Sequence, residues 1–314
     1  MDGFIDNYMS KNGSKSKSTR TTMIGNMRRL EKVLGVDVED MSINNFKNSE
    51  TVLDKLIENY SLASVISTVN GVIAFLRFLK APDGVVEDYV EITKDLAEER
   101  KNVSHTQEKS ELEKENWIDY NELKPKVEEA VDSVLERKVP PTVFRNIMIV
   151  ALLTLQPPAR LGNYLHMVYK DGSKMKRKAE SLKKDRNYVI EDDGKFKFVF
   201  NKYKTAKSVG QVVTEVKDDR LNKLLNKWFQ DYNTSKKNFL VNANGSKMSQ
   251  EGASNAIRSG TKRITGKELT LNALRHIFLT HFTSSNPSIE EKTEVAALVG
   301  QTYKPSRMEL YARV

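Results

Sequence analysis

The stretch LNALRHIFLTHF, residues 271–282, places a charged side chain inside an apolar helical pattern. Arg275 follows Leu274 and is followed closely by Ile277, so a helix through this stretch would bury a guanidinium among hydrocarbon side chains. A desolvated charge without a partner costs several kcal/mol, so we expect a hydrogen-bonding partner or an anionic ligand here. The same reasoning applies to Arg160, which follows a buried apolar helix and a double proline.

The composition indicates an acidic macromolecular partner. The 314 residues include 51 Lys and Arg against 42 Asp and Glu, which gives a net charge of +9. Nucleic acid or an anionic membrane would suit this surplus. The chain has no cysteine and only four histidines, which excludes disulfides, thiolate metal sites and cysteine nucleophiles and leaves little material for a zinc cluster. We therefore expect no metal and no cofactor.

No targeting or membrane segment is recognisable in the sequence. The N-terminus, MDGFIDNYMSKNGSKSKS, has no apolar core of signal-peptide length, and no stretch approaches the ~18 apolar residues of a membrane span. The lysines are scattered along the chain, which disfavours a helix lying on a membrane surface. We expect an intracellular protein, in a host nucleus or the cytoplasm, that is not secreted and has no membrane partner.

Periodic and polar stretches alternate along the chain and predict two domains. Residues 1–17 contain a Ser/Lys/Gly run and are expected to form a flexible basic arm. Four amphipathic helices are predicted within residues 18–99, which form an N-terminal helical domain. Residues 100–116 are almost entirely charged or polar and are expected to be a linker to the second domain, residues 117–314.

The second domain is predicted to be mainly helical with one β insertion. The run VFRNIMIVALLTL, residues 143–155, is almost wholly apolar and predicts a buried central helix. Three β-rich segments, Tyr188–Ile190, Phe196–Phe200 and Val209–Val216, follow around an Asp-Gly turn and predict a small antiparallel sheet. Helices resume from Leu221. The fold class is therefore mainly α with a small antiparallel β-sheet, an α+β arrangement.

Arg160, Arg275 and Tyr311 are the ingredients of metal-free phosphoryl transfer, and the segments that carry them resemble the tyrosine recombinases, or phage-integrase-type site-specific recombinases. LRHIFLTHF, Leu274–Phe282, resembles the family's second arginine box, in which L-R-H-x-F-x-T-H is the common run. Arg160 in LQPPARLGNYLHM resembles the first arginine box, VGQTY resembles the turn glycine segment, and Tyr311 in LYARV resembles the nucleophile box.

This resemblance implies a fold, a reaction and a role for each residue. Residues 18–99 would be the helical core-binding domain and residues 117–314 the catalytic domain. Tyr311 would attack a DNA phosphodiester and form a 3′-phosphotyrosyl intermediate without metal or ATP. Arg160 and Arg275 would bind the non-bridging oxygens, and Lys204 in NKYKTAKS, with Lys207 as the second choice, would protonate the leaving 5′-oxygen.

Three positions depart from the family pattern or compete within it. Asn272 stands where the second box usually has histidine or lysine, and Gln301 stands where histidine or tryptophan usually follows the turn glycine. Both can donate a hydrogen bond to phosphate, but neither titrates near neutral pH. Tyr303 is an alternative nucleophile to Tyr311, and its neighbours indicate a turn. His276 could orient the second arginine or contact phosphate.

The resemblance further implies a double-stranded DNA partner with a specific target site, on which a homotetramer would act at two sites. The divergent boxes and the many Lys and Asn residues point to a virus or mobile element, with roles in DNA recombination or integration. A type IB topoisomerase-like enzyme and a catalytically weakened DNA-binding descendant stay open as alternatives. A basic RNA-binding or membrane-peripheral protein is a third, unrelated one.

Overall fold

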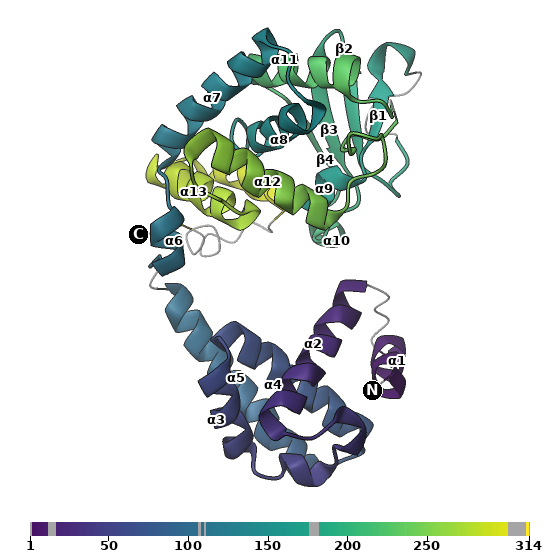
Figure 1. Cartoon of the computed structure of the whole chain (residues 1–314), viewed down its shortest axis with the longest axis vertical. Helices are drawn as coiled ribbons and strands as arrows, with labels where there is room; N and C mark the ends of the chain where they lie inside the picture. Colours follow the sequence, from purple (N-terminus) through teal and green to yellow (C-terminus); the bar gives the residue numbers. More distant parts are fainter. Residues whose placement is uncertain are drawn as a thin grey trace. The chain divides into compact units, whose positions relative to one another are not determined.

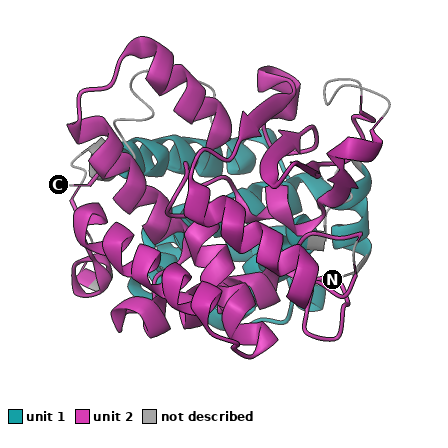
Figure 2. Cartoon of the chain, turned by 90° about the horizontal axis from the view of Figure 1, so that it is seen from above, with its two compact units in different colours: residues 1–106 teal, residues 107–314 magenta. Residues whose placement is uncertain are grey.

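The chain forms two compact units, Met1–Thr106 and Gln107–Val314, which Figure 1 shows with their elements labelled and Figure 2 draws in different colours. The computed structural model describes residues 2–11, 17–105, 108–109, 111–175, 182–235, 237–300 and 312–313. None of the helices within these ranges combines the length and the apolar character needed to cross a lipid bilayer.

The first unit is a bundle of helices around α4. Its helices are α1 (Asp2–Lys11), α2 (Lys17–Leu34), α3 (Ser49–Asn59), α4 (Leu62–Phe78) and α5 (Asp83–His105). Helix α4 contacts the four others, because its apolar residues leave almost no polar face. A buried hydrogen bond from the Tyr89 hydroxyl to the Phe46 carbonyl, 3.0 Å long, ties α5 to the turn before α3. The four helices predicted within residues 18–99 are confirmed.

The N-terminal segment departs from the flexible arm predicted for residues 1–17. Residues Asp2–Lys11 form α1, whose Phe4 and Ile5 are only 3% and 0% exposed. The Phe4 ring meets the Phe75 ring of α4 edge-on, with 5.0 Å between their centroids. A short helix is marginal by itself, and packing against α4 supplies the stability that its polar composition lacks.

The segment predicted as a linker, residues 100–116, is helical over much of its described length. Helix α5 continues to His105, and α6 spans Glu111–Asn116. Glu and Lys have good helix propensity, so a stretch that cannot build a core can still continue or form a helix. The boundary between the two units falls within this segment.

The second unit is built around the buried helix that residues 143–155 predict. The remaining helices are α7 (Tyr120–Glu136), α8 (Pro141–Leu152), α9 (Leu161–Leu165), α10 (Ala206–Val209), α11 (Asp219–Lys227), α12 (Gln250–Thr265), α13 (Leu271–Ser284) and α14 (Ile289–Leu298). Helix α8 packs against α7, α11 and α12. A Cβ at Gly260 of α12 would lie 2.8 Å from the Asn146 carbonyl oxygen, so glycine permits this close helix crossing.

The sheet is small, as predicted, but mixed rather than purely antiparallel. Its strands are β1 (Val168–Asp171), β2 (Tyr188–Asp192), β3 (Lys195–Phe200) and β4 (Val212–Glu215), in the order β1-β2-β3-β4. Strands β2, β3 and β4 pair antiparallel, with Asp193 and Gly194 at positive φ in the β2–β3 turn. Strand β1, which the sequence did not predict, pairs with β2 in parallel. The residues between β1 and β2 are numerous enough for the crossover that a parallel pair requires. The class, mainly α with a small sheet, is confirmed.

Candidate active site

Arg160 lies at the N-terminus of α9, where the extended segment after the double proline ends. Its own backbone is extended, with φ −63° and ψ 140°, and the helix begins at Leu161. The side chain is partly buried, and its buried Nη1 atom has no hydrogen-bond partner among the described residues. A buried donor without a partner costs about 1–3 kcal/mol, and more when it is charged. This guanidinium is therefore available to an anionic oxygen.

Arg275 lies in the second turn of α13 and is only 4% exposed. Its Nη2 donates to the carbonyl oxygen of Val299 at 2.8 Å. The helix that carries it begins after Thr270, whose Oγ1 accepts from the backbone N–H of Ala273 at 3.2 Å. Arg275 thus has a main-chain hydrogen-bonding partner at the end of α14.

The turn Val299–Gly300 joins three segments that are far apart in the sequence. The Val299 carbonyl accepts from Arg275, and the Gly300 carbonyl accepts from the hydroxyl of Thr205 at 2.9 Å. Gly300 has φ +72°, and a Cβ placed there would lie 3.9 Å from the Nε and Cζ atoms of Arg160. Both arginines and the β3–β4 loop therefore meet at one turn.

Lys204 is exposed in the loop between β3 and β4, directly before Thr205. The loop is closed across its width because the hydroxyl of Tyr203 donates to the Gly210 carbonyl at 2.7 Å. Burial raises the pKa of Tyr203, so this phenol stays protonated and able to donate at neutral pH. Lys207, the second choice for the general acid, is also exposed and lies on α10. Because the hydroxyl of Thr205 is bonded to the Gly300 carbonyl, Lys204 is one residue away from a contact with the turn that both arginines reach.

Tyr311, Gln301 and Tyr303 lie outside the described residues. Arg313, two positions after Tyr311 in the sequence, is held on α13, since its backbone N–H donates to Thr280 Oγ1 at 2.8 Å. Thr280 follows Arg275 by five positions on this helix, which corresponds to about 7.5 Å along its axis. The chain adjoining the predicted nucleophile is thus attached to the helix that carries the second arginine.

Three further polar residues lie on α13, of which Asn272 and His276 are four positions apart and share a face, while His281 lies on another face. Asn272 is exposed in the first turn, and His276, next to Arg275, is partly buried. The ring of His281 stacks on Tyr120, with 4.5 Å between centroids and 22° between planes. Burial raises the pKa of Tyr120 to about 12. Asn272 and His276 stay candidates for phosphate contact, whereas the contacts of His281 are those of a packing residue.

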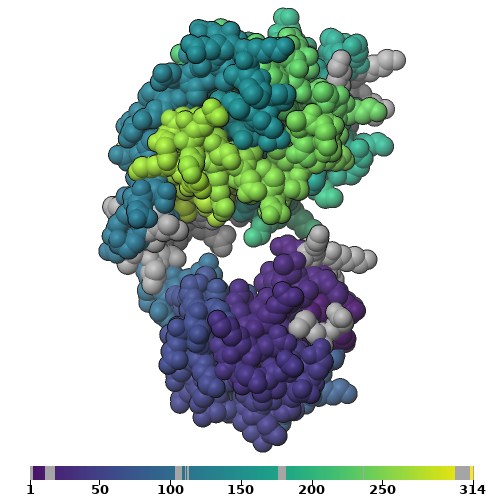
Figure 3. All heavy atoms as spheres, viewed as in Figure 1, coloured from purple at the N-terminus to yellow at the C-terminus, as the bar shows by residue number. Residues whose placement is uncertain are grey.

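Helix α12 presents polar and basic side chains on one exposed face, and Figure 3 shows α12 and α13, coloured green to yellow, at the surface of the second unit. The exposed residues at helical spacing are Asn255, Arg258, Ser259, Lys262 and Arg263. Repeats of three and four residues place them on the same side of the helix.

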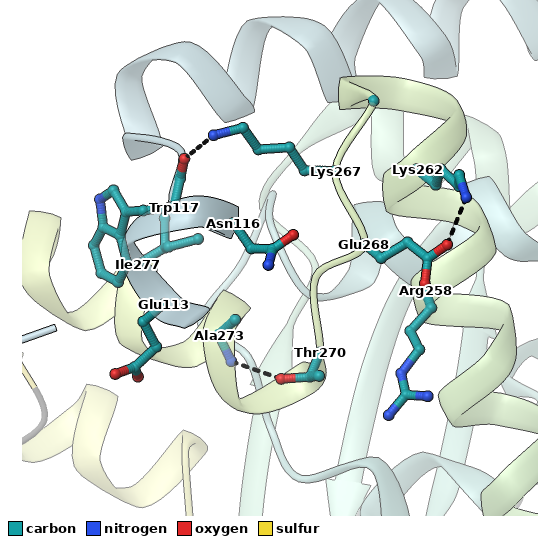
Figure 4. A pocket seen from close by; sticks show the side chains of 11 residues that line it. Glu113, Asn116, Trp117, Arg258, Lys262, Lys267, Glu268, Thr270, Ala273 and Ile277 are labelled. Atoms are coloured by element: carbon teal, nitrogen blue, oxygen red, sulfur yellow. Dashed lines mark hydrogen bonds and ion pairs between the residues drawn. The ribbon is translucent and has the colours of Figure 1, made fainter. Parts of the chain in front are cut away.

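A cavity of about 510 Å³ lies between α6, α12 and the start of α13 (Figure 4). Across its wall, Lys262 Nζ contacts Glu268 Oε1 at 2.7 Å, and Lys267 Nζ donates to the Trp117 carbonyl at 2.5 Å. Neither Arg160 nor Arg275 lines it. This cavity is therefore separate from the turn at which the arginines meet.

Sequence reasoning identified the charged residues but missed their main-chain and hydroxyl partners. Thr205 and Thr280 have no pattern of their own, although Thr205 stands beside the predicted lysine and Thr280 lies in the quoted stretch 271–282. Within the described part of the chain, no group of three or more His, Asp or Glu side chains lies close enough together to hold a metal ion.

The sequence matches no protein-family model and no curated protein sequence. Among solved structures, the crystal structure of XerA recombinase is similar, with a TM-score of 0.40 and 13% sequence identity over 100% of this chain and 94% of that one. The crystal structure of the XerH site-specific recombinase bound to its difH substrate, a pre-cleavage complex, has a TM-score of 0.47 and 12% identity over 93% of this chain and 92% of that one.

Proposed function

We propose that this chain is a site-specific DNA recombinase that cleaves and rejoins strands through a phosphotyrosine at Tyr311. The observation that carries the proposal is the turn Val299–Gly300, at which Arg160, Arg275 and the loop of the predicted lysine come together. Two guanidiniums that converge on one point can stabilise the charge that builds up on a phosphate under attack. The sequence boxes around both arginines and the tyrosine support the same reaction.

In the proposed reaction, the phenol of Tyr311 gives up its proton to solvent water, and its oxygen forms a bond to phosphorus while the bond from phosphorus to the 5′-oxygen breaks. The guanidiniums of Arg160 and Arg275 bind the non-bridging oxygens through charge-assisted hydrogen bonds. The ammonium of Lys204 gives its proton to the departing 5′-oxygen. The phosphotyrosyl ester keeps the energy of the broken bond, so a 5′-hydroxyl can later attack it and rejoin a strand.

Duplex DNA is the proposed partner. The net charge of +9 and the exposed basic face of α12 suit a polyanion. By family resemblance, four protomers act on two specific sites, inside a cell, in the recombination or integration of a viral or mobile element.

The test is covalent trapping on nicked duplexes whose central sequence is randomised. A nick beside the scissile phosphate lets a short strand diffuse away, so the phosphotyrosyl adduct accumulates and survives denaturing electrophoresis. We expect the wild-type chain to form this adduct and Tyr311→Phe to form none while still binding DNA, because only the nucleophilic hydroxyl is removed. Tyr303→Phe is the matched control and should retain the adduct.

An adduct in Tyr311→Phe but not in Tyr303→Phe would assign the nucleophile to Tyr303. A complete absence of adduct in the wild-type chain would contradict the proposed reaction and favour a DNA-binding descendant. The DNA recovered from the adduct identifies the site. Relaxation of a supercoiled plasmid that lacks this site would instead indicate a topoisomerase.

A further inference from the structure

Asn187 is a buried amide in the second unit, directly before β2, and uses every hydrogen-bonding position that it has. It is 4% exposed. Its Oδ1 accepts from the backbone N–H groups of Asn201 at 2.8 Å and of Lys202 at 2.7 Å. Its Nδ2 donates to the carbonyls of Asn163 at 2.8 Å and of Lys202 at 3.0 Å. An amide side chain has two donors and two acceptor lone pairs, so the group is fully satisfied.

These four bonds connect the two segments that would face each other across a phosphate. Asn163 belongs to α9, and its backbone N–H donates to the carbonyl of Arg160 at 2.8 Å. Asn201 and Lys202 open the β3–β4 loop, two residues before Lys204. One side chain therefore sets the spacing between the start of the lysine loop and the helix that follows the first arginine.

The loop is also held on the C-terminal side of Lys204, by contacts that do not involve Asn187. Thr205 holds the loop to the Gly300 carbonyl, and Gln211 Nε2 donates to Asn201 Oδ1 at 2.6 Å across the base of the loop. Lys204 thus lies between an anchor at Asn187 and an anchor at Thr205. Removing the Asn187 side chain leaves the loop held by Thr205 and by Asn201, whose Nδ2 donates to the Arg186 carbonyl at 3.0 Å, but it removes the hydrogen bond from Asn187 to α9.

We propose that Asn187 is a positioning residue for proton transfer: it holds the Lys204 loop at the distance from Arg160 at which the ammonium reaches the 5′-oxygen. The inference rests on the proposed function. Asn187 touches neither DNA nor the reacting atoms in this scheme and acts through Lys204 alone.

The chain provides a matched control in Asn222 of α11, whose buried side chain binds the first half of β3. Asn222 is 3% exposed, accepts from the Phe196 N–H at 2.9 Å and donates to the carbonyls of Val216 at 2.8 Å and Asp218 at 3.1 Å. Its loss removes a buried amide that is bonded to β3, whereas Asn187 is bonded to the two residues that follow β3. Asn222 contacts no residue of the lysine loop in these hydrogen bonds.

The experiment compares two forms of the nicked substrate recovered from the trapping reaction, in the full-length chain. One has the natural 5′-oxygen at the scissile phosphate, and the other has sulfur at this bridging position. The sulfur leaves as a thiolate and needs no proton, because thiols are stronger acids than alcohols. Lys204→Ala should slow adduct formation about 10²- to 10⁴-fold on the oxygen substrate. On the sulfur substrate its rate should return to that of the wild-type chain.

Asn187→Ala should follow the same pattern with a smaller loss, about 10- to 100-fold on oxygen, since a displaced group loses rate through geometry. It should regain the wild-type rate on sulfur, and adding it to Lys204→Ala should cause no further loss on oxygen. Asn222→Ala should change the oxygen and sulfur rates by the same factor.

Should Asn187→Ala not fold, as judged by circular dichroism, Asn187→Ser takes its place. The serine hydroxyl can keep one hydrogen bond to the surrounding backbone, adds no buried charge and is too short to bind the loop and α9 together. An Asn187 variant that is equally slow on both substrates, or slow on neither, would overturn the inference. A wild-type chain that forms an adduct with neither substrate would contradict the proposed function instead, so the two failures are distinguishable.

Discussion

Arg160 combines partial burial with a donor, Nη1, that has no acceptor in the described part of the chain. Protein stability alone would disfavour this arrangement, because burying a guanidinium without a partner lowers the free energy of unfolding. The open donor therefore indicates a ligand, and an anion suits it best.

We expect Arg160→Ala to slow adduct formation about 10²- to 10³-fold, the usual effect of removing one donor to a developing oxyanion. The free energy of unfolding should stay the same or rise slightly, since a desolvated charge is removed. Rates of covalent trapping and urea unfolding measure the two effects. Arg145→Ala, which removes a guanidinium of α8 bonded to its neighbour Asn146, is the control. Equal losses of activity in both variants would contradict a specific role for Arg160.

At the scale of elements, the end of α14 organises the site without contributing a reactive side chain. Both carbonyls of the Val299–Gly300 turn are occupied, one by an arginine and the other by a threonine of the β3–β4 loop. The left-handed φ of +72° at Gly300 makes this geometry available to glycine at little cost.

Gly300→Ala should cost about 1–2 kcal/mol of stability, because a side chain in the left-handed region is strained. The same strain should displace the two carbonyls and lower the rate of adduct formation by a larger factor than stability explains. Gly266→Ala is the matched control: its φ is +78° and no atom lies within 4 Å of the added Cβ. If both variants lose the same stability and the same activity, the turn has no special role in the site.

Helices with a long apolar periodicity could be predicted from the sequence. Elements that are stable only through contacts with other parts of the fold could not. Helices α8 and α13 follow directly from their apolar patterns. Helix α1 was missed because its few apolar residues become sufficient only once Phe4 packs on Phe75. Strand β1 was missed because its sequence, VYKD, shows no alternation of apolar and polar residues.

The candidate site was predictable to the same extent. A charge inside an apolar helix is visible in the sequence, so Arg275 could be identified, and Arg160 was identified by its position after a buried helix and a double proline. Main-chain carbonyls carry no residue signature, so the sequence could not reveal that Val299 and Gly300 unite these arginines with Thr205. Asn187 was also hidden, since nothing distinguishes a fully bonded asparagine from an exposed one before the chain is folded.

At the scale of the whole molecule, the described hydrophobic residues form separate cores in the two units. The buried residues of the main core of the first unit lie between positions 4 and 96, and those of the second unit lie between positions 118 and 298. No residue belongs to both of these clusters. Each unit thus has the core that a domain needs to fold as a cooperative unit.

We expect two thermal transitions in calorimetry, each sensitive to substitutions in one unit. Ile5→Ala in α1 and Leu224→Ala in α11, both at residues that are 0% exposed, should each cost about 2–5 kcal/mol through the cavity left behind. Each should lower the midpoint of one transition and leave the other unchanged. A single transition that shifts with either substitution would show that the cores unfold together. No effect of Ile5→Ala would mean that α1 contributes nothing to its unit.

The bond between Thr280 and the Arg313 amide has a mechanical consequence for the proposed reaction. Helix α13 carries Arg275 and also binds the backbone of Arg313, two residues after Tyr311 in the sequence. If this helix slides or tilts when DNA binds, both attachments travel in the same direction by a similar amount. The distance between the Arg275 side chain and the Arg313 backbone then changes little during such a movement.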